Sequence, residues 1–267
     1  MFVIIKGAGD LASGIALRLH RSGFTVVMTE TAAPLAVRRT VAFSQAVYDG
    51  VTQVEDLTAV LARNEAEMRA ASAAGRIAVF VDPAAETVRA FRPGAVVDAI
   101  MAKRNIGTSI SDAPVVVAIG PGFTAGIDCH AVVETKRGHS LGRVITEGSA
   151  FPNTGIPGDI GGFTLERLLR AGAGGVFEAK AAIGDRVKKG GLVAVVRHDA
   201  APATPVCAEI DGIVRGLLPS GLAVTKGLKL GDIDPRCERA HCFTVSDKAL
   251  AVGGGVLEAI LGRAGRI

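Results

Sequence analysis

The sequence predicts an α/β fold, with a Rossmann-like parallel sheet in the N-terminal half, a small all-β barrel after it and a helix at the C-terminus. Fully apolar runs alternate with helical patterns up to about residue 120, which is typical of a doubly wound parallel sheet. From Val176 onward, short apolar runs are separated by glycine turns at roughly eight-to-twelve-residue spacing, which is typical of a barrel or sandwich. Ser246 and Asp247 then resemble a helix N-cap ahead of an apolar stripe.

The N-terminal half is expected to alternate strands and helices. It opens with an apolar strand over residues 2–5, a glycine turn, and a helix that ends near Gly23, a residue that tolerates positive φ. A helix is also expected over 54–71, where apolar residues recur at helical spacing between charges. The other expected strands cover residues 25–29, 77–81, 95–99 and 115–119, with a further apolar run at 46–48.

Composition divides the chain into four expected segments. Residues 1–120 form a Rossmann-like nucleotide-binding domain, and residues 121–175 form a Gly- and Pro-rich segment that ends in a helix near 163–171. Residues 176–236 form the barrel, and residues 237–267 form the C-terminal helical segment. Three successive glycines in this last segment each cost about 1 kcal/mol in a helix, so they predict a break or close backbone packing.

Composition also excludes several classes of function. A formal charge of +4 and an aromatic content of 4% without Trp argue against a nucleic-acid partner. No uninterrupted apolar stretch reaches the roughly 18 residues that a membrane span needs. The N-terminus lacks a secretory signal pattern and the four cysteines are scattered, so we expect a cytoplasmic protein with free thiols.

The sequence GAGDLA after the first strand is the GxGxxA form of the dinucleotide-binding fingerprint. Gly7 permits the tight turn, Gly9 lets the backbone approach a pyrophosphate, and Ala12 allows close packing of the helix on the strand. The amino end of the helix would supply N–H donors and positive dipole for phosphates. Glu30, at the end of the second strand, is placed to accept hydrogen bonds from ribose hydroxyls, which favours NAD over NADP.

Charged residues near this fingerprint modify the expected site. Asp10 lies beside the position of the anion and would repel it unless its side chain turns away. Arg38 and Arg39 follow the second strand on the ligand side, where a guanidinium could bind a phosphate or carboxylate through two nitrogens. The alternative is a packing turn in a Rossmann-like sheet with no nucleotide bound.

A second group of candidates consists of His130, Glu134 and His139. If residues 131–135 form a strand, His130 and Glu134 point to one face and could line a catalytic site together. His130 and His139 are also weak candidates for metal ligands. The same spacing fits a polar ligand or structural hydrogen bonds, so the alternatives stay open.

Cys237 and Cys242 form the third group of catalytic candidates, with Arg239 and His241 between them. Neighbouring cations lower the pKa of a thiol, so these cysteines could carry sulfur-transfer or redox chemistry. A buried free cysteine is the commoner arrangement for this residue type.

Longer strings of sequence resemble one family over nearly the whole chain. They are VIIKGAGDLASGIA from Val3, PLAVRRTVAFSQAVYDG from Pro34, GPGFTAGIDCHAVVETKRGHSLGRVI from Gly120, PNTGIPG from Pro152, GDIDPR from Gly231 and TVSDKALAVGGGVLEAIL from Thr244. Through them the chain resembles the YqeB-type accessory proteins of the selenium-dependent molybdenum hydroxylase system, distant relations of the XdhC-type proteins. The resemblance implies a role in maturing a molybdenum hydroxylase, by handling its molybdopterin cofactor, its sulfur or selenium ligand, or the apoenzyme.

The β-rich segment carries a second resemblance. GDRVKKGGLVAVV from Gly184, AEIDGIVRGLL from Ala208 and GLAVTKGLKLGDI from Gly221 are similar to the two halves of a biotinyl or lipoyl barrel. Between the halves the chain reads RHDAAPATPVC, without the lysine that such a hairpin would carry in modified form. The resemblance therefore implies a barrel that acts as a scaffold or docking module.

These features favour an accessory factor that binds a nucleotide, NAD-like dinucleotide or molybdopterin species in the crevice. Its partners would be a molybdenum hydroxylase apoenzyme or cofactor-maturation proteins, and it could form a homodimer. One alternative is an NAD-dependent oxidoreductase with His130 as proton donor. The other is a non-catalytic adaptor that docks through the lysine-less barrel, so whether the chain catalyses a reaction stays open.

Overall fold

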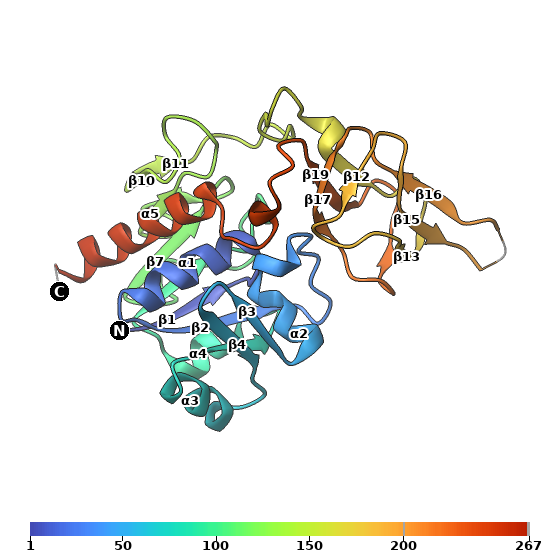
Figure 1. Cartoon of the computed structure of the whole chain (residues 1–267). Coiled ribbons are helices and arrows are strands. Elements are labelled where there is room, and N and C mark those ends of the chain that lie inside the picture. Colours follow the sequence, from blue (N-terminus) through green and yellow to red (C-terminus); the bar gives the residue numbers. More distant parts are fainter. Residues whose placement is uncertain (200, 266–267) are drawn as a thin grey trace. The chain divides into compact units, whose positions relative to one another are not determined.

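The computed structural model describes residues 1–199 and 201–265 and divides the chain into two compact units (Figure 1). The first unit combines Met1–Pro34, Val41–Thr154 and Val245–Ile267, and the second combines Leu35–Thr40 with Gly155–Thr244. Ala200, in the expected lysine-less hairpin, and residues 266–267, at the end of the expected C-terminal segment, lie outside the described residues. The four-part division expected from the sequence stays a prediction.

A nine-stranded sheet forms the centre of the first unit, in the order β10-β9-β7-β6-β1-β2-β5-β4-β3. Its strands are β1 (Phe2–Lys6), β2 (Thr25–Glu30), β3 (Val51–Val54), β4 (Leu57–Leu61), β5 (Ile77–Val81), β6 (Ala95–Asp98), β7 (Val115–Ile119), β9 (Ala131–Val133) and β10 (Val144–Ile145). The inner strands pair in parallel, whereas β3 and β10 pair antiparallel with β4 and β9. The expected purely parallel sheet is therefore wrong, because the sheet is mixed.

The main local error concerns residues 51–73. The helix expected over 54–71 is replaced by a hairpin of β3 and β4, followed by α3 (Glu65–Ala73). Glu55 takes a φ of 53° at the tight turn between the strands, and alternate residues of β4 are buried, so the local pattern fits a strand. The apolar run at 46–48, grouped with the strands, lies in the short helix α2 (Ala46–Asp49).

Helices α1 (Asp10–Arg21) and α5 (Asp247–Ala264) pack side by side in the first unit (Figure 1). A Cβ on Gly14 would lie 2.6 Å from the Cβ of Ala249, and one on Gly253 would lie 2.8 Å from the carbonyl oxygen of Gly14. The glycine triplet therefore permits close packing inside one continuous helix. Ser246 caps α5 by accepting a hydrogen bond from the N–H of Ala249, as its sequence signal predicts.

Short elements complete the first unit. Helix α4 (Glu86–Phe91) lies between β5 and β6 in the chain, and β8 (Thr124–Ala125) pairs with β11 (Gly148–Ser149) as a separate two-stranded sheet. The apolar core is divided into two clusters of buried residues. The nine-stranded sheet contributes to both, as expected for a sheet buried on its two faces.

The second unit contains two four-stranded sheets, in the orders β12-β19-β17-β14 and β16-β15-β13-β18. Their strands are β12 (Leu168–Arg170), β13 (Gly175–Ala179), β14 (Arg186–Val187), β15 (Leu192–Arg197), β16 (Thr204–Cys207), β17 (Gly212–Leu217), β18 (Ala223–Val224) and β19 (Lys229–Asp234). Phe177, Leu217 and Ile233, from the two sheets, share one buried cluster. The described strands form no closed barrel, so the expected biotinyl/lipoyl-like barrel is wrong.

The helix expected over 163–171 is also absent from the described structure. Its place is taken by a 3-10 turn, Leu165–Arg167, and by strand β12. Leu168 and Leu169 pair with residues of β19. Long-range pairing with a strand far along the sequence therefore overrides the helical spacing of the local pattern.

Candidate functional site

The glycine loop of the first unit lies at a point where the order of the sheet reverses. Strand β1 has β2 on one side and β6 on the other, and all three strands are parallel. The chain leaves β1 through α1 towards β2 and later returns to the other side of β1 as β6. Ligands of open α/β sheets bind at such a switch point, beyond the carboxyl ends of the strands.

Gly7 and Gly9 differ in their surroundings. Gly7 has a φ of +93°, and a Cβ there would lie 3.0 Å from the carbonyl oxygen of Ala99, so the loops after β1 and β6 are in close contact. At Gly9 an added Cβ would meet nothing within 4 Å among the described residues. Gly9 is also the N-cap of α1 and contributes no capping side chain. The amino end of α1 therefore faces open space beside a fixed turn, while Ala12 is buried at the start of the helix.

Glu30 closes the other side of this loop. Its Oε2 accepts a hydrogen bond from the N–H of Ala8 at 3.0 Å, and its Oε1 accepts one from the N–H of Thr31 at 2.8 Å. The sequence places an acid at the end of the second strand, and here that acid is bonded directly to the glycine loop. The carboxylate therefore fixes the orientation of the loop.

Asp10, the first residue of α1, is partly balanced by Lys248 of α5. Burial lowers the pKa of Lys248 below its ordinary value, and the nearby Asp10 opposes that shift. Asp10 is therefore part of a local pair of opposite charges at the edge of the loop. This pairing reduces the repulsion that Asp10 alone would exert on an anion at the helix terminus.

A buried network lies beside the loop and was missed by the sequence interpretation. Lys6 and Asp98 are register partners at the ends of β1 and β6. The Nζ of Lys6 donates to Oγ1 of Thr108 at 2.6 Å, and Oγ1 of Thr108 donates to Oδ2 of Asp98 at 2.5 Å. Lys6 and Asp98 also form an ion pair at 3.9 Å. The available signal was a charged residue at the end of each of two otherwise apolar strands.

Glu134 and His130 are engaged by the backbone. Glu134 is 1% exposed, and its carboxylate oxygens accept from the N–H groups of Lys136 and Phe151 at 2.6 and 2.8 Å. The Nδ1 of His130 accepts from the N–H of Val116 at 2.9 Å. Burial, then Arg263, lowers the pKa of His130, so the neutral imidazole is favoured. Both side chains hold loop and strand ends in place.

His139 lies on the exposed surface of the first unit. The described residues contain no group of three or more His, Cys, Asp or Glu side chains placed to hold a metal ion. Burial, then the charge of Asp128, raises the pKa of the Cys129 thiol to about 11. The catalytic role of His130, Glu134 and His139 stays a prediction.

The two remaining cysteine candidates belong to the second unit. Cys237 is half-buried, whereas Cys242 is buried and its Sγ lies 3.6 Å from the carbonyl oxygen of Val214. Burial raises the pKa of Cys242, while the neighbouring Arg215 opposes that shift. A thiol held in this way is mostly protonated at neutral pH. Its role in catalysis, like that of Cys237, stays a prediction.

The structure places Arg38 and Arg39 in the second unit. Arg38 donates to the carbonyl oxygens of His241 and Thr244 at 3.2 and 3.3 Å. The Nε of Arg39 donates to the carbonyl oxygen of Leu217 at 2.7 Å. These bonds fix the segment Leu35–Thr40 to the sheet that contains β17 and β19. Neither arginine is in the same unit as the glycine loop.

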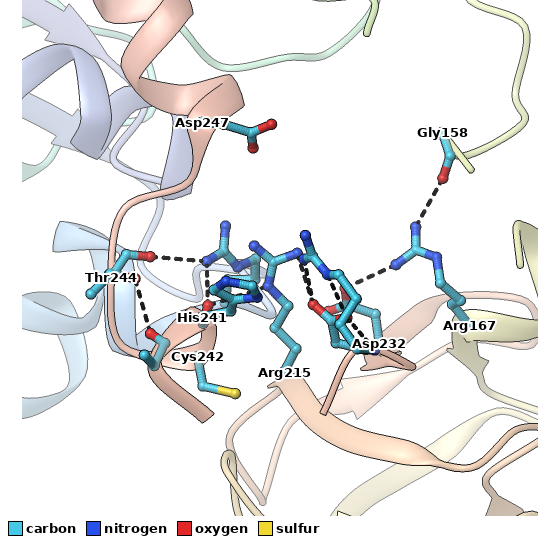
Figure 2. A network of polar contacts seen from close by, with 12 residues as sticks. Gly158, Arg167, Arg215, Asp232, His241, Cys242, Thr244 and Asp247 are labelled. Atoms are coloured by element: carbon cyan, nitrogen blue, oxygen red, sulfur yellow. Dashed lines mark hydrogen bonds and ion pairs between the residues drawn. The ribbon is translucent and has the colours of Figure 1, made fainter. Parts of the chain in front are cut away.

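Arg38 is part of what we call the arginine network: Arg38, Arg167, Arg215, Arg236, Asp232, Asp234 and His241. Asp234 binds Arg236 through both carboxylate oxygens, at 2.9 and 2.6 Å, and forms an ion pair with Arg215 at 3.5 Å. Figure 2 shows Arg167 with the carbonyl of Gly158 on one side and Asp232 on the other. The network brings together residues that are distant in sequence.

Comparison with curated proteins finds a relative that is 52% identical over 260 residues, the uncharacterized protein YqeB of Escherichia coli strain K12. The match covers 97% of this chain and 47% of YqeB, so the chain spans about half the length of that relative. No family model matches the chain. None of the described helices is both long and apolar enough to span a membrane.

Two solved structures with low similarity cover most of the chain. An aspartoacylase family protein from Mesorhizobium loti is 12% identical, with 87% of this chain and 84% of that chain covered and a TM-score of 0.31. A succinylglutamate desuccinylase from Silicibacter sp. TM1040 is 10% identical, with 87% of this chain and 84% of that chain covered and a TM-score of 0.28. Likenesses of this degree carry no argument for a hydrolase activity in this chain.

These findings correct the XdhC-like accessory family and the function expected from the sequence. The curated relative is uncharacterized, and the structural neighbours are aspartoacylase and desuccinylase family proteins rather than XdhC-like proteins. The expected role in maturing a selenium-dependent molybdenum hydroxylase is therefore wrong. The alternatives of an NAD-dependent oxidoreductase and of an adaptor docking through a barrel are wrong as well, the second because the described strands form no closed barrel.

Proposed function

We propose that the first unit binds a small molecule carrying a phosphate or pyrophosphate group at the carboxyl edge of its sheet. The binding groups are the backbone N–H groups at the amino end of α1, beside the turn at Gly7. The carboxylate of Glu30 holds that turn in place through the N–H of Ala8. A cytoplasmic setting is part of the proposal and is supported by the four free cysteines. The proposal concerns binding alone and includes no redox reaction.

The observation that carries this proposal is the open space at Gly9. At Gly7 the backbone of Ala99 fills the space beside the turn. At Gly9 the described residues leave the Cβ position open, in front of the first turn of α1, where the N–H groups of Leu11 and Ala12 have no partner within the helix. Backbone donors and the helix dipole favour an anion at that position.

Substitution of Gly9 tests the proposal. Gly9→Leu places a side chain in the open space, so the protein should fold normally and lose affinity for pyrophosphate at least about tenfold in isothermal titration calorimetry. Gly262→Leu is the matched control, because Gly262 is also open but lies near the end of α5. Its pyrophosphate affinity should equal that of the wild type.

Two results would overturn the proposal. Wild-type protein that fails to bind pyrophosphate or any phosphate-bearing small molecule at millimolar concentration would show that the loop is a packing turn. Equal affinity in wild type and Gly9→Leu, with matching far-UV circular dichroism and thermal stability, would place the binding elsewhere in the chain.

A further inference from the structure

Helices α1 and α5 place their amino ends at the same edge of the sheet. A Cβ on Gly14 of α1 would lie 2.6 Å from the Cβ of Ala249, and one on Gly253, a turn further along α5, would lie 2.8 Å from the Cγ of Arg18. The contacts therefore advance in the same direction along both helices, which run parallel and side by side (Figure 1). Because α1 begins directly after β1, the amino end of α5 also lies at the carboxyl edge of the sheet.

Lys248, in the first turn of α5, lies on the face of that helix that is turned towards the sheet. Residues three or four apart share one face, and Val252, one turn further on, is fully buried in the same core cluster as Val133 at the end of β9. A Cβ on Gly255 would lie 2.8 Å from Cγ1 of Val133. Lys248 is about 10 Å closer to the amino end than Gly255, so it projects beyond the carboxyl edge.

Lys248 also lies close to the glycine loop. Its neighbour Ala249 packs against Gly14, and Gly9 is about 7.5 Å further towards the amino end of α1. Side chains on a helix tilt towards its amino end, so the four-carbon stem of Lys248 extends towards the open space at Gly9. Asp10, next to Gly9, is accordingly among the charges that act on Lys248.

The ammonium of Lys248 has no bonded acceptor in the part of the chain that the structure describes. The side chain is half-buried, and its Nζ makes no hydrogen bond and no direct ion pair there. The charged groups that face it are Asp10 of α1, Glu134 and Arg137 after β9, and Asp247 of its own helix. Glu134 accepts from two backbone N–H groups, and Asp247 binds Arg137 at 2.8 and 3.3 Å. An anion at the carboxyl edge would supply the missing acceptor.

We infer that the ammonium of Lys248 is the charged group of the carboxyl-edge site and donates to a terminal phosphate of its ligand. The inference rests on the proposed function of the same edge. A terminal phosphate has three non-bridging oxygens and carries about two negative charges at neutral pH, so it can accept from the N–H groups of α1 and from Lys248 together. The internal phosphates of a dinucleotide offer fewer acceptors and less charge. The ligand class is therefore a mono- or diphosphate ester, or pyrophosphate itself.

Isothermal titration calorimetry with pyrophosphate tests the role of Lys248. Lys248→Met keeps an unbranched stem and removes the charge, so the affinity should fall at least about tenfold, because a charge-assisted hydrogen bond is lost. Lys248→Arg keeps the charge and should bind within about threefold of wild type. Arg263→Met is the matched control, because it removes the same charge from an exposed position near the other end of α5. Its pyrophosphate affinity should equal that of wild type.

Two further measurements distinguish a ligand-binding ammonium from a structural one. Dimethyl pyrophosphate carries a methyl ester on each phosphorus and so has no terminal phosphate. Wild type should bind it at least about tenfold more weakly than pyrophosphate, and Lys248→Met should reduce this preference at least about threefold. Burial lowers the pKa of Lys248, so the affinity advantage of wild type over Lys248→Met should shrink between about pH 7 and pH 10, where binding needs a proton that the free protein has released.

The outcomes separate this inference from the proposed function. If Gly9→Leu weakens pyrophosphate binding but folded Lys248→Met keeps the wild-type affinity, the edge binds phosphate without the lysine and the inference is overturned. An equal preference for pyrophosphate over its dimethyl ester in wild type and in Lys248→Met would overturn the assignment of a terminal phosphate to Lys248. Wild-type protein that binds no pyrophosphate at millimolar concentration would overturn the proposed function, and the inference with it.

Discussion

Two buried charged networks of this protein differ in how completely their polar atoms are bonded. In the first unit, Lys6, Thr108 and Asp98 form a closed network in which one lysine meets one carboxylate through a bridging hydroxyl. In the second unit, Arg167 and Asp232 form an ion pair at 3.8 Å, and Arg167 Nε and Asp232 Oδ1 have no hydrogen-bond partner among the described residues. Burial of charged side chains alone therefore does not identify a binding site. The closed network holds two strand ends together, whereas the Arg167–Asp232 pair leaves buried polar atoms without hydrogen bonds.

The largest expected effect comes from breaking the closed network. Lys6→Ala removes the cation and leaves Asp98, with a side chain 2% exposed, as an uncompensated buried charge. The free energy of unfolding should fall by about 3–5 kcal/mol. Urea denaturation followed by circular dichroism measures the change, with Arg69→Ala in the exposed Glu65–Arg69 pair as control, expected within about 0.5 kcal/mol of wild type. A loss below about 1 kcal/mol for Lys6→Ala would show that the network is not structural.

A smaller effect tests whether packing, as well as charge, holds the first unit together. Gly14→Ala places a methyl group 2.6 Å from the Cβ of Ala249, so the two helices must separate, at a cost of about 1–3 kcal/mol. Gly254→Ala adds a methyl group where the described structure leaves open space, and should stabilise α5 by about 0.5–1 kcal/mol. Urea denaturation followed by circular dichroism measures the stability change of each variant. Equal effects of the two substitutions would contradict the proposed helix contact.

Replacing the incompletely bonded pair sharpens the comparison further. The double variant Arg167→Met with Asp232→Leu removes a buried cation, a buried anion and two unbonded atoms together. Its free energy of unfolding should lie within about 1 kcal/mol of wild type, because apolar residues often replace buried ion pairs without loss. A loss comparable to that of Lys6→Ala would show that the second network is as structural as the first.

The smallest effect is the pH dependence from Lys248. Burial lowers its pKa in the folded protein, so the unfolded chain binds the proton more tightly. Stability should therefore rise as the pH passes the lowered pKa towards the ordinary value of 10.5, where the folded protein releases the proton first. Denaturation curves of Lys248→Met should lack this rise. A wild-type stability that instead falls across this range, with no difference in the variant, would contradict the assigned direction.

Local signals in the sequence predict local structure well in this chain. The strand, glycine turn and helix at the N-terminus and the Ser246 cap are confirmed, because short-range backbone geometry determines them. The sheet's mixed character and the β3–β4 hairpin were not predicted, since the apolar spacing of residues 54–61 also fits a helix. The expected single parallel sheet is wrong because β3 and β10 pair antiparallel with their neighbours. The expected closed barrel is wrong because the described strands of the second unit form two four-stranded sheets.

In the candidate sites, too, contacts set by local spacing could be predicted, whereas contacts set by the pairing of distant strands could not. Gly7 and Gly9 lie in one turn, and Glu30 ends the next strand at the spacing that the dinucleotide-binding fingerprint requires, so their meeting could be predicted from spacing alone. Arg167, Arg215 and Asp232 come from separate strands and turns, and only the register of β12, β17 and β19 brings them together. Arg38 was predicted to bind an anion, but sequence gave no indication that its neighbours lie in the second unit.

Hydrogen exchange with mass spectrometry is the most direct test of phosphate binding at the carboxyl edge, because it reports on the backbone N–H groups that this site would use. With pyrophosphate added, the amides of residues 8–12 in the glycine loop and the first turn of α1 should exchange more slowly than in the free protein, and this protection should be absent in Gly9→Leu. Unchanged exchange in those residues at a pyrophosphate concentration that saturates calorimetric binding would contradict the proposal that this edge binds the phosphate group.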